Sequence, residues 1–106
     1  MNETHLKLLR AIEANPEASQ RELSVALGVS LGKANYCLKA LMEKGWVKAG
    51  NFKANPDKGK YLYLLTPQGL EAKASLTLNF LRRKQAEYDV LRAEIAALQR
   101  EVETRP

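Results

Sequence analysis

The sequence predicts a mainly α-helical fold with one small β-hairpin and a long C-terminal helix, divided into a globular part (1–66) and the helix (67–106). Three observations lead to this fold class. Apolar residues recur at helical spacing in three short segments before residue 46. Two short segments of alternating aromatic and aliphatic residues follow. From Pro67 onwards no other proline interrupts the chain until Pro106.

The first helix is expected to begin after Thr4, whose hydroxyl can act as the N-cap, and to stop at Asn15-Pro16. A second helix is expected from Ser19 to about Leu27, because Ser19 and Glu22 have the spacing of a capping box. The inward apolar residues of the first helix are expected to be Leu6, Leu8, Leu9 and Ile12. Those of the second helix are expected to be Leu23, Ala26 and Leu27.

A third helix is expected close behind the second. Gly28 favours a turn because glycine tolerates positive φ, and Ser30 can cap a helix that runs to about Lys44 before Gly45. The connection is thus as short as that of a helix-turn-helix. One face of the third helix is small and apolar, with Ala34, Cys37, Leu38 and Leu41. The other face carries Gly32, Asn35, Tyr36, Lys39 and Glu43 and is free for a partner.

A hairpin follows the third helix. Its strands are expected at 46–53 and 61–65, joined by the turn-forming residues Asn55-Pro56-Asp57. Lys53, Lys58 and Lys60 lie around its tip. Three helices and a basic hairpin, in this order, are typical of a winged helix-turn-helix.

The last segment predicts one helix over about 67–104, with Thr66 as N-cap and Pro67 in its first turn. At 1.5 Å per residue it would be on the order of 55 Å long and must protrude from a domain of this size. Its apolar residues alternate by three and four, as in a coiled-coil seam, interrupted by Lys84. We therefore expect a homodimer through Leu81, Tyr88, Leu91, Ile95, Leu98 and Val102.

The positive charge of the chain lies in one window. The 106 residues have a formal net charge of +5, and residues 30–60 hold seven Lys against only Glu43 and Asp57, which accounts for all of it. Such a localised basic segment is typical of a nucleic-acid contact, because neutralised phosphates release condensed counterions. A solvated lysine-rich surface is the alternative explanation of the same charge.

The third helix carries residue types that are suited to contacts with duplex DNA. The Asn35 amide can pair with adenine, Lys39 can reach guanine or phosphate, and Gly32 permits close backbone approach. Ser30, the first-turn amides and the start of the second helix can hold phosphates. The full set of expected DNA contacts is Gln20, Arg21, Ser30, Leu31, Gly32, Lys33, Asn35, Tyr36, Lys39, Lys53, Lys58 and Lys60.

Catalysis has few groups to use. His5 is the only histidine and Cys37 the only cysteine, so a metal-ligand set or a nucleophile with a histidine partner is not expected, and neither is a cofactor. Cys37 is expected in the core rather than as an oxidation switch. One cysteine excludes an internal disulfide, and the absence of a secretory signal or a long apolar stretch favours a cytoplasmic protein that does not enter membranes.

The segment from Ser19-Gln-Arg-Glu-Leu through Leu27-Gly-Val-Ser-Leu-Gly-Lys-Ala-Asn-Tyr-Cys to Gly45-Trp-Val-Lys resembles the MarR family of winged-helix regulators. Asn51-Phe-Lys, Tyr63-Leu-Leu-Thr-Pro-Gln-Gly-Leu and the charged last helix are similar to its short exopolysaccharide-associated subgroup. The resemblance implies a homodimer on a pseudo-palindromic operator, usually as a repressor, with residues 30–44 in the major groove.

The chain departs from this family in two respects. It starts almost directly at the helix before the helix-turn-helix, whereas the usual member has a further N-terminal helix, so the family's ligand pocket and a small-molecule effector are not expected. The hairpin carries Lys where the family often has Arg, which weakens the case for a bidentate minor-groove contact.

Two other functions remain open from the sequence. The long helix of a winged-helix interaction module could dock on a different protein, with the basic surface incidental. An RNA-binding protein would share the charge but prefer single strands.

Overall fold

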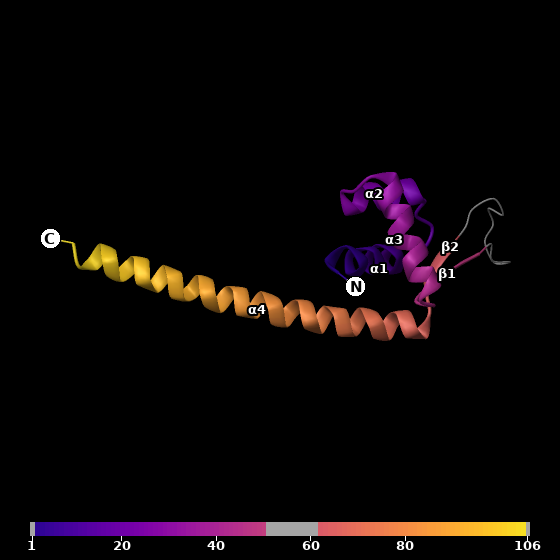
Figure 1. Ribbon diagram of the computed structural model, residues 1–106. Helices are drawn as coiled ribbons and strands as arrows, with labels where there is room; N and C mark the ends of the chain where they lie inside the picture. Colours follow the sequence, from indigo (N-terminus) through magenta and orange to yellow (C-terminus); the bar gives the residue numbers. More distant parts are fainter. Residues whose placement is uncertain (1, 51–61, 106) are drawn as a thin grey trace. The chain divides into compact units, whose positions relative to one another are not determined.

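The computed structural model describes residues 2–50 and 62–105 and confirms the expected order of elements (Figure 1). Three short helices come first, followed by a two-stranded hairpin and one long helix. Their bounds are α1 Glu3–Ala14, α2 Gln20–Leu27, α3 Leu31–Glu43, β1 Val47–Gly50, β2 Leu62–Leu65 and α4 Pro67–Glu103. The expected fold class, mainly α with a small β-hairpin, is therefore confirmed.

The first helix begins earlier than expected, because its N-cap is Asn2 rather than Thr4. Asn2 has extended backbone, and its Oδ1 accepts a hydrogen bond from the His5 amide at 3.2 Å. The Asn2 amide in turn donates to His5 Nδ1 at 3.4 Å, so both groups of a capping box are satisfied. Asn is among the strongest N-caps and outcompetes Thr4, which lies inside α1.

The second helix has the expected caps but a different buried face. Ser19 Oγ accepts from the Glu22 amide at 3.1 Å, which confirms the capping box. Leu23 is buried as expected, whereas the expectation for Ala26 is wrong: it is exposed, and Ser24 is buried in its place. Burial of Ser24 is tolerated because its hydroxyl donates to a backbone carbonyl of the same helix at 2.7 Å.

The hairpin is antiparallel, with Val47 opposite Leu65 and Ala49 opposite Tyr63. These four residues share the face that packs against the core. The described strands are shorter than expected: β1 starts after Trp46, and the rest of both expected strands, with the turn between them, lies outside the described residues. The Tyr63 amide donates to the carbonyl of Pro16 at 3.0 Å, which ties β2 to the loop between α1 and α2.

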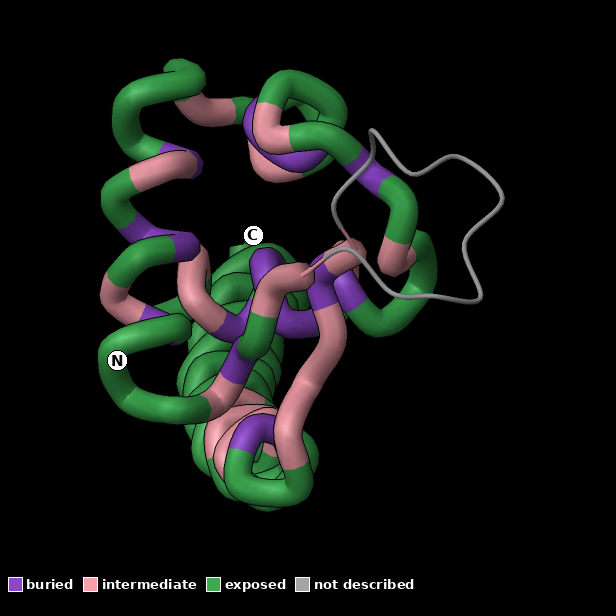
Figure 2. Tube along the Cα trace, turned by 90° about the vertical axis from the view of Figure 1, so that its right-hand side faces the viewer, coloured by how far each residue is buried: buried purple, intermediate pink, exposed green. Residues whose placement is uncertain are grey.

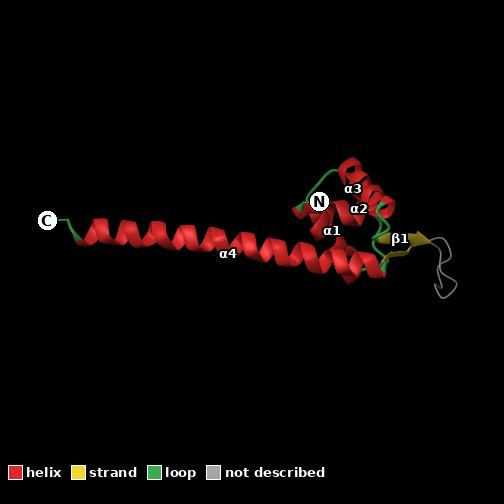
Figure 3. Ribbon diagram, turned by 60° about the horizontal axis from the view of Figure 1, so that its bottom comes forward, coloured by secondary structure: helices red, strands yellow, loops and turns green. Residues whose placement is uncertain are grey.

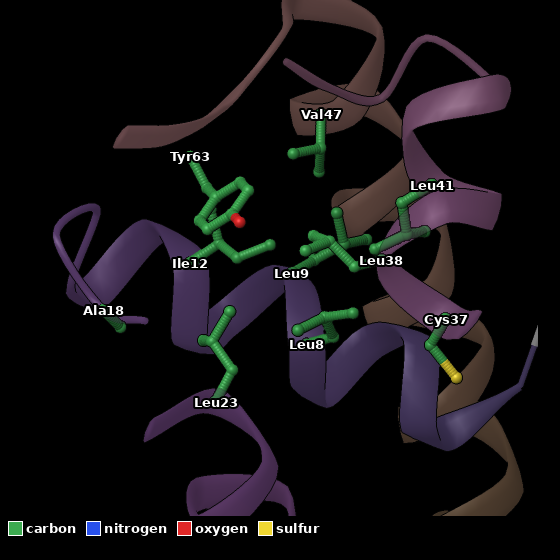
Figure 4. Close-up of a cluster of buried hydrophobic side chains, with 10 residues drawn as sticks. All are labelled: Leu8, Leu9, Ile12, Ala18, Leu23, Cys37, Leu38, Leu41, Val47 and Tyr63. Carbon is green, nitrogen blue, oxygen red and sulfur yellow. The ribbon is translucent and has the colours of Figure 1, made fainter. Parts of the chain in front are cut away.

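The core lies where α1, α2, α3 and the hairpin meet (Figure 4). Figure 4 shows Tyr63 beside Ile12 of α1, and Leu9 of α1 beside Leu38 of α3, with Val47 above them. Ten residues form the core: Leu8, Leu9, Ile12, Ala18, Leu23, Cys37, Leu38, Leu41, Val47 and Tyr63. All the apolar residues expected inside α1 and α3 are buried, so the helical spacing predicted these faces correctly.

The first turn of α4 is fixed to the end of α3 and the start of the hairpin (Figure 3). Thr66 caps the helix as expected, since its Oγ1 accepts from the Gly69 amide at 3.0 Å. Its hydroxyl donates to the carbonyl of Gly45, and its amide donates to the carbonyl of Trp46 at 3.0 Å. Gly69 is buried against Trp46, and a Cβ at this position would lie 2.0 Å from the Trp46 carbonyl oxygen.

By contacts the chain divides into two compact units, Met1–Leu76 and Thr77–Pro106. The start of α4 therefore belongs to the first unit, where Leu76 packs against the core and Lys73 Nζ lies 3.1 Å from Glu13 Oε1. Residues 81–105 are exposed throughout, as the green tube in Figure 2 shows. None of the helices in the described part of the chain has the length and apolar character needed to cross a membrane.

Candidate nucleic-acid interface

Two caps set the turn between α2 and α3. Gly28 ends α2 with φ +69°, the left-handed conformation that glycine adopts without strain. Ser30 begins α3, and its Oγ accepts from the Lys33 amide at 3.1 Å. The connection is the three residues 28–30, so the expected helix-turn-helix is present in the first unit.

The third helix has two distinct faces. Ala34, Cys37, Leu38 and Leu41 are each at most 3% exposed and form the inner face. The outer face is accessible, and Tyr36 keeps 75% of its surface although it is large and aromatic. The expected contacts that the structure brings together on this outer face are Leu31, Gly32, Lys33, Tyr36 and Lys39. Because the inner face anchors the helix in the core, the side chains of the outer face are not needed for packing and can contact a partner.

Asn35 lies at the edge of this face, not at its centre. It is half-buried and lines a hollow of about 280 Å³ between α3, the start of α2 and the hairpin. The other lining residues are Gln20, Leu38, Lys39, Met42, Ala49 and Tyr63. The Asn35 amide is therefore recessed beside Lys39, while Tyr36 projects outwards.

The two helix N-termini differ in how available their groups are. At the start of α2, Arg21 is exposed, but Gln20 is half-buried, and its Nε2 donates to the Tyr63 hydroxyl at 3.4 Å. At the start of α3 the amides of Leu31 and Gly32 have no hydrogen-bond partner among the described residues. A Cβ on Gly32 would have nothing within 4 Å, so the backbone there is open to a close approach.

Only some of the lysines of the basic window lie within the described residues. Lys48 is exposed on β1, whereas Lys44 Nζ lies 5.3 Å from the centre of the Trp46 ring and is packed back on the domain. The expected contacts Lys53, Lys58 and Lys60 lie outside the described residues.

Sequence reasoning missed the roles of Tyr63 and Met42 at the hollow. Strand alternation indicates that Tyr63 points inwards, but only the register of the hairpin brings its hydroxyl to Gln20. Met42 is 40% exposed and lines the hollow with Lys39. Its position in the sequence of α3 does not indicate whether its side chain is buried or exposed. No local pattern in the sequence signals either role.

The two residues considered for other chemistry have structural surroundings. Cys37 is 3% exposed, as expected of a core residue. Partial burial lowers the pKa of His5, and the positive charges of the amino terminus and of Lys44 lower it further. Among the described residues no three His, Cys, Asp or Glu side chains are grouped to hold a metal ion.

The second unit presents an apolar face. Tyr88, Leu91, Ile95, Leu98 and Val102 are between 47% and 71% exposed along α4, and no described residue covers them. Leu81 is 50% exposed. Lys84 Nζ lies 3.2 Å from Glu87 Oε2, and this ion pair separates Leu81 from the others.

Comparison with known proteins agrees with this geometry. Residues 1–48 match the family model described as winged helix-turn-helix DNA-binding. No curated protein matches the sequence.

Several solved structures share the fold over almost the whole chain. The PcaV transcriptional regulator from Streptomyces coelicolor, in complex with its natural ligand, matches with a TM-score of 0.69 at 17% identity over 98% of this chain and 76% of its own. The transcriptional repressor CouR, bound to a 23-mer DNA duplex, matches with a TM-score of 0.70 at 22% identity over 98% and 73%. A MarR protein from Peptoclostridium difficile matches with a TM-score of 0.66 at 22% identity over 96% and 71%.

The family match covers the helix-turn-helix and the start of the hairpin, and the structural matches extend through α4. Residues 1–48 thus match the winged helix-turn-helix DNA-binding model, and the chain shares its fold with the solved structures of PcaV, CouR and the Peptoclostridium difficile MarR protein.

Proposed function

We propose that this chain is a cytoplasmic, sequence-specific regulator of transcription that binds double-stranded DNA as a homodimer on a pseudo-palindromic operator. The observation that carries the proposal is α3. The inner face of α3 is buried in the core, and Lys33, Tyr36 and Lys39 are exposed on its outer face. The helix directly follows the short helix-turn-helix connection. A helix presented in this way fits the major groove.

Each part of the surface has a role in this proposal. Lys39 reaches base edges or phosphates from the middle of α3, and the recessed Asn35 amide pairs with a base that enters the edge of the hollow. The Ser30 hydroxyl and the free amides of Leu31 and Gly32 hold a phosphate at the helix N-terminus. Arg21 and the wing lysines Lys53, Lys58 and Lys60 add contacts to the backbone.

Repression, and control of exopolysaccharide genes, rest on the resemblance to the short subgroup of the MarR family. The fold shared with CouR, a repressor bound to DNA in its own structure, supports the mode of binding. We assign no catalytic activity, cofactor or small-molecule effector.

Titration of duplex DNA over a salt series tests DNA binding directly. We expect affinity to fall steeply with salt, and Lys39→Ala to lower both the affinity and the magnitude of the log–log slope, by about one unit for one lost phosphate contact. Lys7→Ala is the matched control, because it removes the same charge from the surface of α1, where Lys7 pairs with Glu3.

DNA binding is contradicted if duplex affinity is absent at low salt, or if Lys39→Ala together with Lys58→Ala leaves it unchanged. A preference for single strands would instead identify an RNA-binding protein.

The exposed apolar face of α4 favours one other function, a winged-helix interaction module whose long helix docks on a different protein. This alternative predicts a monomer in isolation. Light scattering at micromolar concentration distinguishes it from the homodimer.

A further inference from the structure

We propose that α4 pairs with α4 of a second copy as a parallel, in-register, two-stranded coiled coil over residues 88–102. The proposal rests on the homodimer proposed above and goes beyond it by assigning the direction and register of the two helices. Three features of α4 carry it: the shape of its apolar side chains, the signs of its flanking charges and the ion pair that interrupts the seam.

The apolar side chains alternate in shape. In heptad notation Tyr88, Ile95 and Val102 occupy a positions, while Leu91 and Leu98 occupy d positions. β-Branched residues at a combined with Leu at d favour two parallel strands over three or four. Both d positions hold Leu, and the a positions 95 and 102 hold β-branched residues, whereas the first a position holds the aromatic Tyr88.

The charges beside the seam distinguish the two directions. Each g position is acidic, with Glu87, Glu94 and Glu101, whereas the e positions carry Arg92 or uncharged Gln. In a parallel pair a g residue meets the e residue five positions later on the other helix, so Glu87 faces Arg92 of the second copy. An antiparallel pair places g beside g and brings Glu against Glu. The charges therefore favour the parallel direction.

Arg92 is available for this contact. It forms no ion pair within the described part of the chain. Glu87 contacts Lys84 through Oε2, and its other carboxylate oxygen is free to accept from a guanidinium. One carboxylate can thus hold a cation on each helix.

The same ion pair defines where the seam begins. Lys84 occupies the d position before Tyr88, where its ammonium lies 3.2 Å from Glu87 Oε2 and 5.2 Å from the centre of the Phe80 ring. A charged group held there interrupts the apolar seam on the side of the first unit. The coiled coil is therefore short, and we expect it to dissociate on dilution.

Disulfide trapping measures the direction. In a Cys37→Ala background, Leu91→Cys and Leu98→Cys each place a thiol on the seam, and Ala93→Cys places one at the outward f position as the control. In a parallel in-register pair each seam residue faces its own copy, so each seam variant alone should form a covalent dimer on mild oxidation, and Ala93→Cys should not. In an antiparallel pair a positions lie opposite d positions, so over 88–102 Leu91 faces Ile95 and Leu98 faces Tyr88. Residues 91 and 98 then lie about 6 Å and about 15 Å along the axis from their own copies, and with the separation between the helices added each pair is beyond disulfide reach.

The proposal is overturned if covalent dimers form only when Leu91→Cys is mixed with Ile95→Cys, or Leu98→Cys with Tyr88→Cys, because these a–d pairs face each other in the antiparallel arrangement. It is also overturned if no seam variant forms a dimer, or if Ala93→Cys does so equally well.

Charge reversal tests the register without altering the seam. Arg92→Glu sets Glu against Glu87 of the second copy, and we expect the dimer dissociation constant in analytical ultracentrifugation to rise roughly three- to tenfold. Arg83→Glu, which makes the same charge change at an outward c position, should leave it unchanged. Glu87→Arg combined with Arg92→Glu should restore dimerisation, and an unaltered constant for Arg92→Glu alone would contradict the parallel register.

DNA binding measured on the same samples separates the two proposals. A parallel dimer that ignores duplex DNA contradicts the proposed function and supports this inference. A DNA-binding dimer that is trapped only when two different cysteine variants are mixed supports the proposed function and contradicts the parallel coiled coil.

Discussion

At the scale of single residues, two helical glycines have opposite surroundings. Gly69 is buried at the start of α4, and a Cβ there would lie 2.0 Å from the carbonyl oxygen of Trp46, a backbone atom that cannot simply move aside. Gly32 lies in the first turn of α3, with nothing within 4 Å of the same added atom. Packing thus requires glycine at position 69, whereas at position 32 it does not, and the backbone there is open to a binding partner.

We therefore expect Gly69→Ala to destabilise the first unit by about 1–3 kcal/mol, because the added methyl group forces the first turn of α4 away from Trp46. Gly32→Ala should raise stability by roughly 0.5–1 kcal/mol, since alanine is the better helix former, and should weaken DNA binding by blocking the close approach. Urea unfolding followed by the fluorescence of Trp46, the single tryptophan, measures both changes. Equal stability of the two variants would contradict the contact.

At the scale of elements, the sequence predicted what local chemistry determines. The capping residues Ser19, Ser30 and Thr66 and the left-handed Gly28 act through hydrogen bonds or backbone angles within a few residues, and all four are where they were expected. Ala26 was misplaced because the side of α2 that is buried depends on its packing against α1 and α3. Asn35 was expected on the open face for a similar reason, since the hollow that recesses it is completed by the hairpin.

Ser30 combines a structural and a proposed binding role, and two substitutions separate them. Ser30→Ala removes the acceptor for the Lys33 amide and should cost about 1 kcal/mol. Ser30→Asp keeps an N-cap acceptor and should preserve stability, but its carboxylate repels the phosphate expected there. We expect DNA affinity to fall for both variants and thermal stability to fall only for Ser30→Ala. Unchanged affinity of Ser30→Asp would exclude a phosphate at this helix end.

At the scale of the whole molecule, the chain has one unit with a core and one helix without. The charge of the sequence located the first unit's candidate surface, and the spacing of α4 indicated the seam, but neither reveals that the start of α4 packs with the first unit as far as Leu76. That boundary depends on the contacts of Leu76 with the core and of Lys73 with Glu13, which are distant in sequence.

Ile95→Asp should produce monomers, because it places a charge in the centre of the seam. DNA affinity should then fall by roughly 10²-fold or more as the second half-site contact is lost. Trp46 fluorescence should stay that of the folded protein, since Ile95 belongs to the second unit. Ala93→Asp, with the same charge at an outward position, is the control. A dimeric Ile95→Asp variant would exclude the seam as the interface.

The contact between Gly69 and Trp46 also has a mechanical consequence. Backbone meets backbone there, so this contact contains no side chain that could change rotamer and absorb a displacement. One turn away Thr66 bonds to Gly45 through its hydroxyl and to Trp46 through its amide. A displacement of the first turn of α4 should therefore move Gly45 and Trp46, the residues between α3 and β1, by a similar amount. Whatever holds or twists that turn acts on α3 and β1 together.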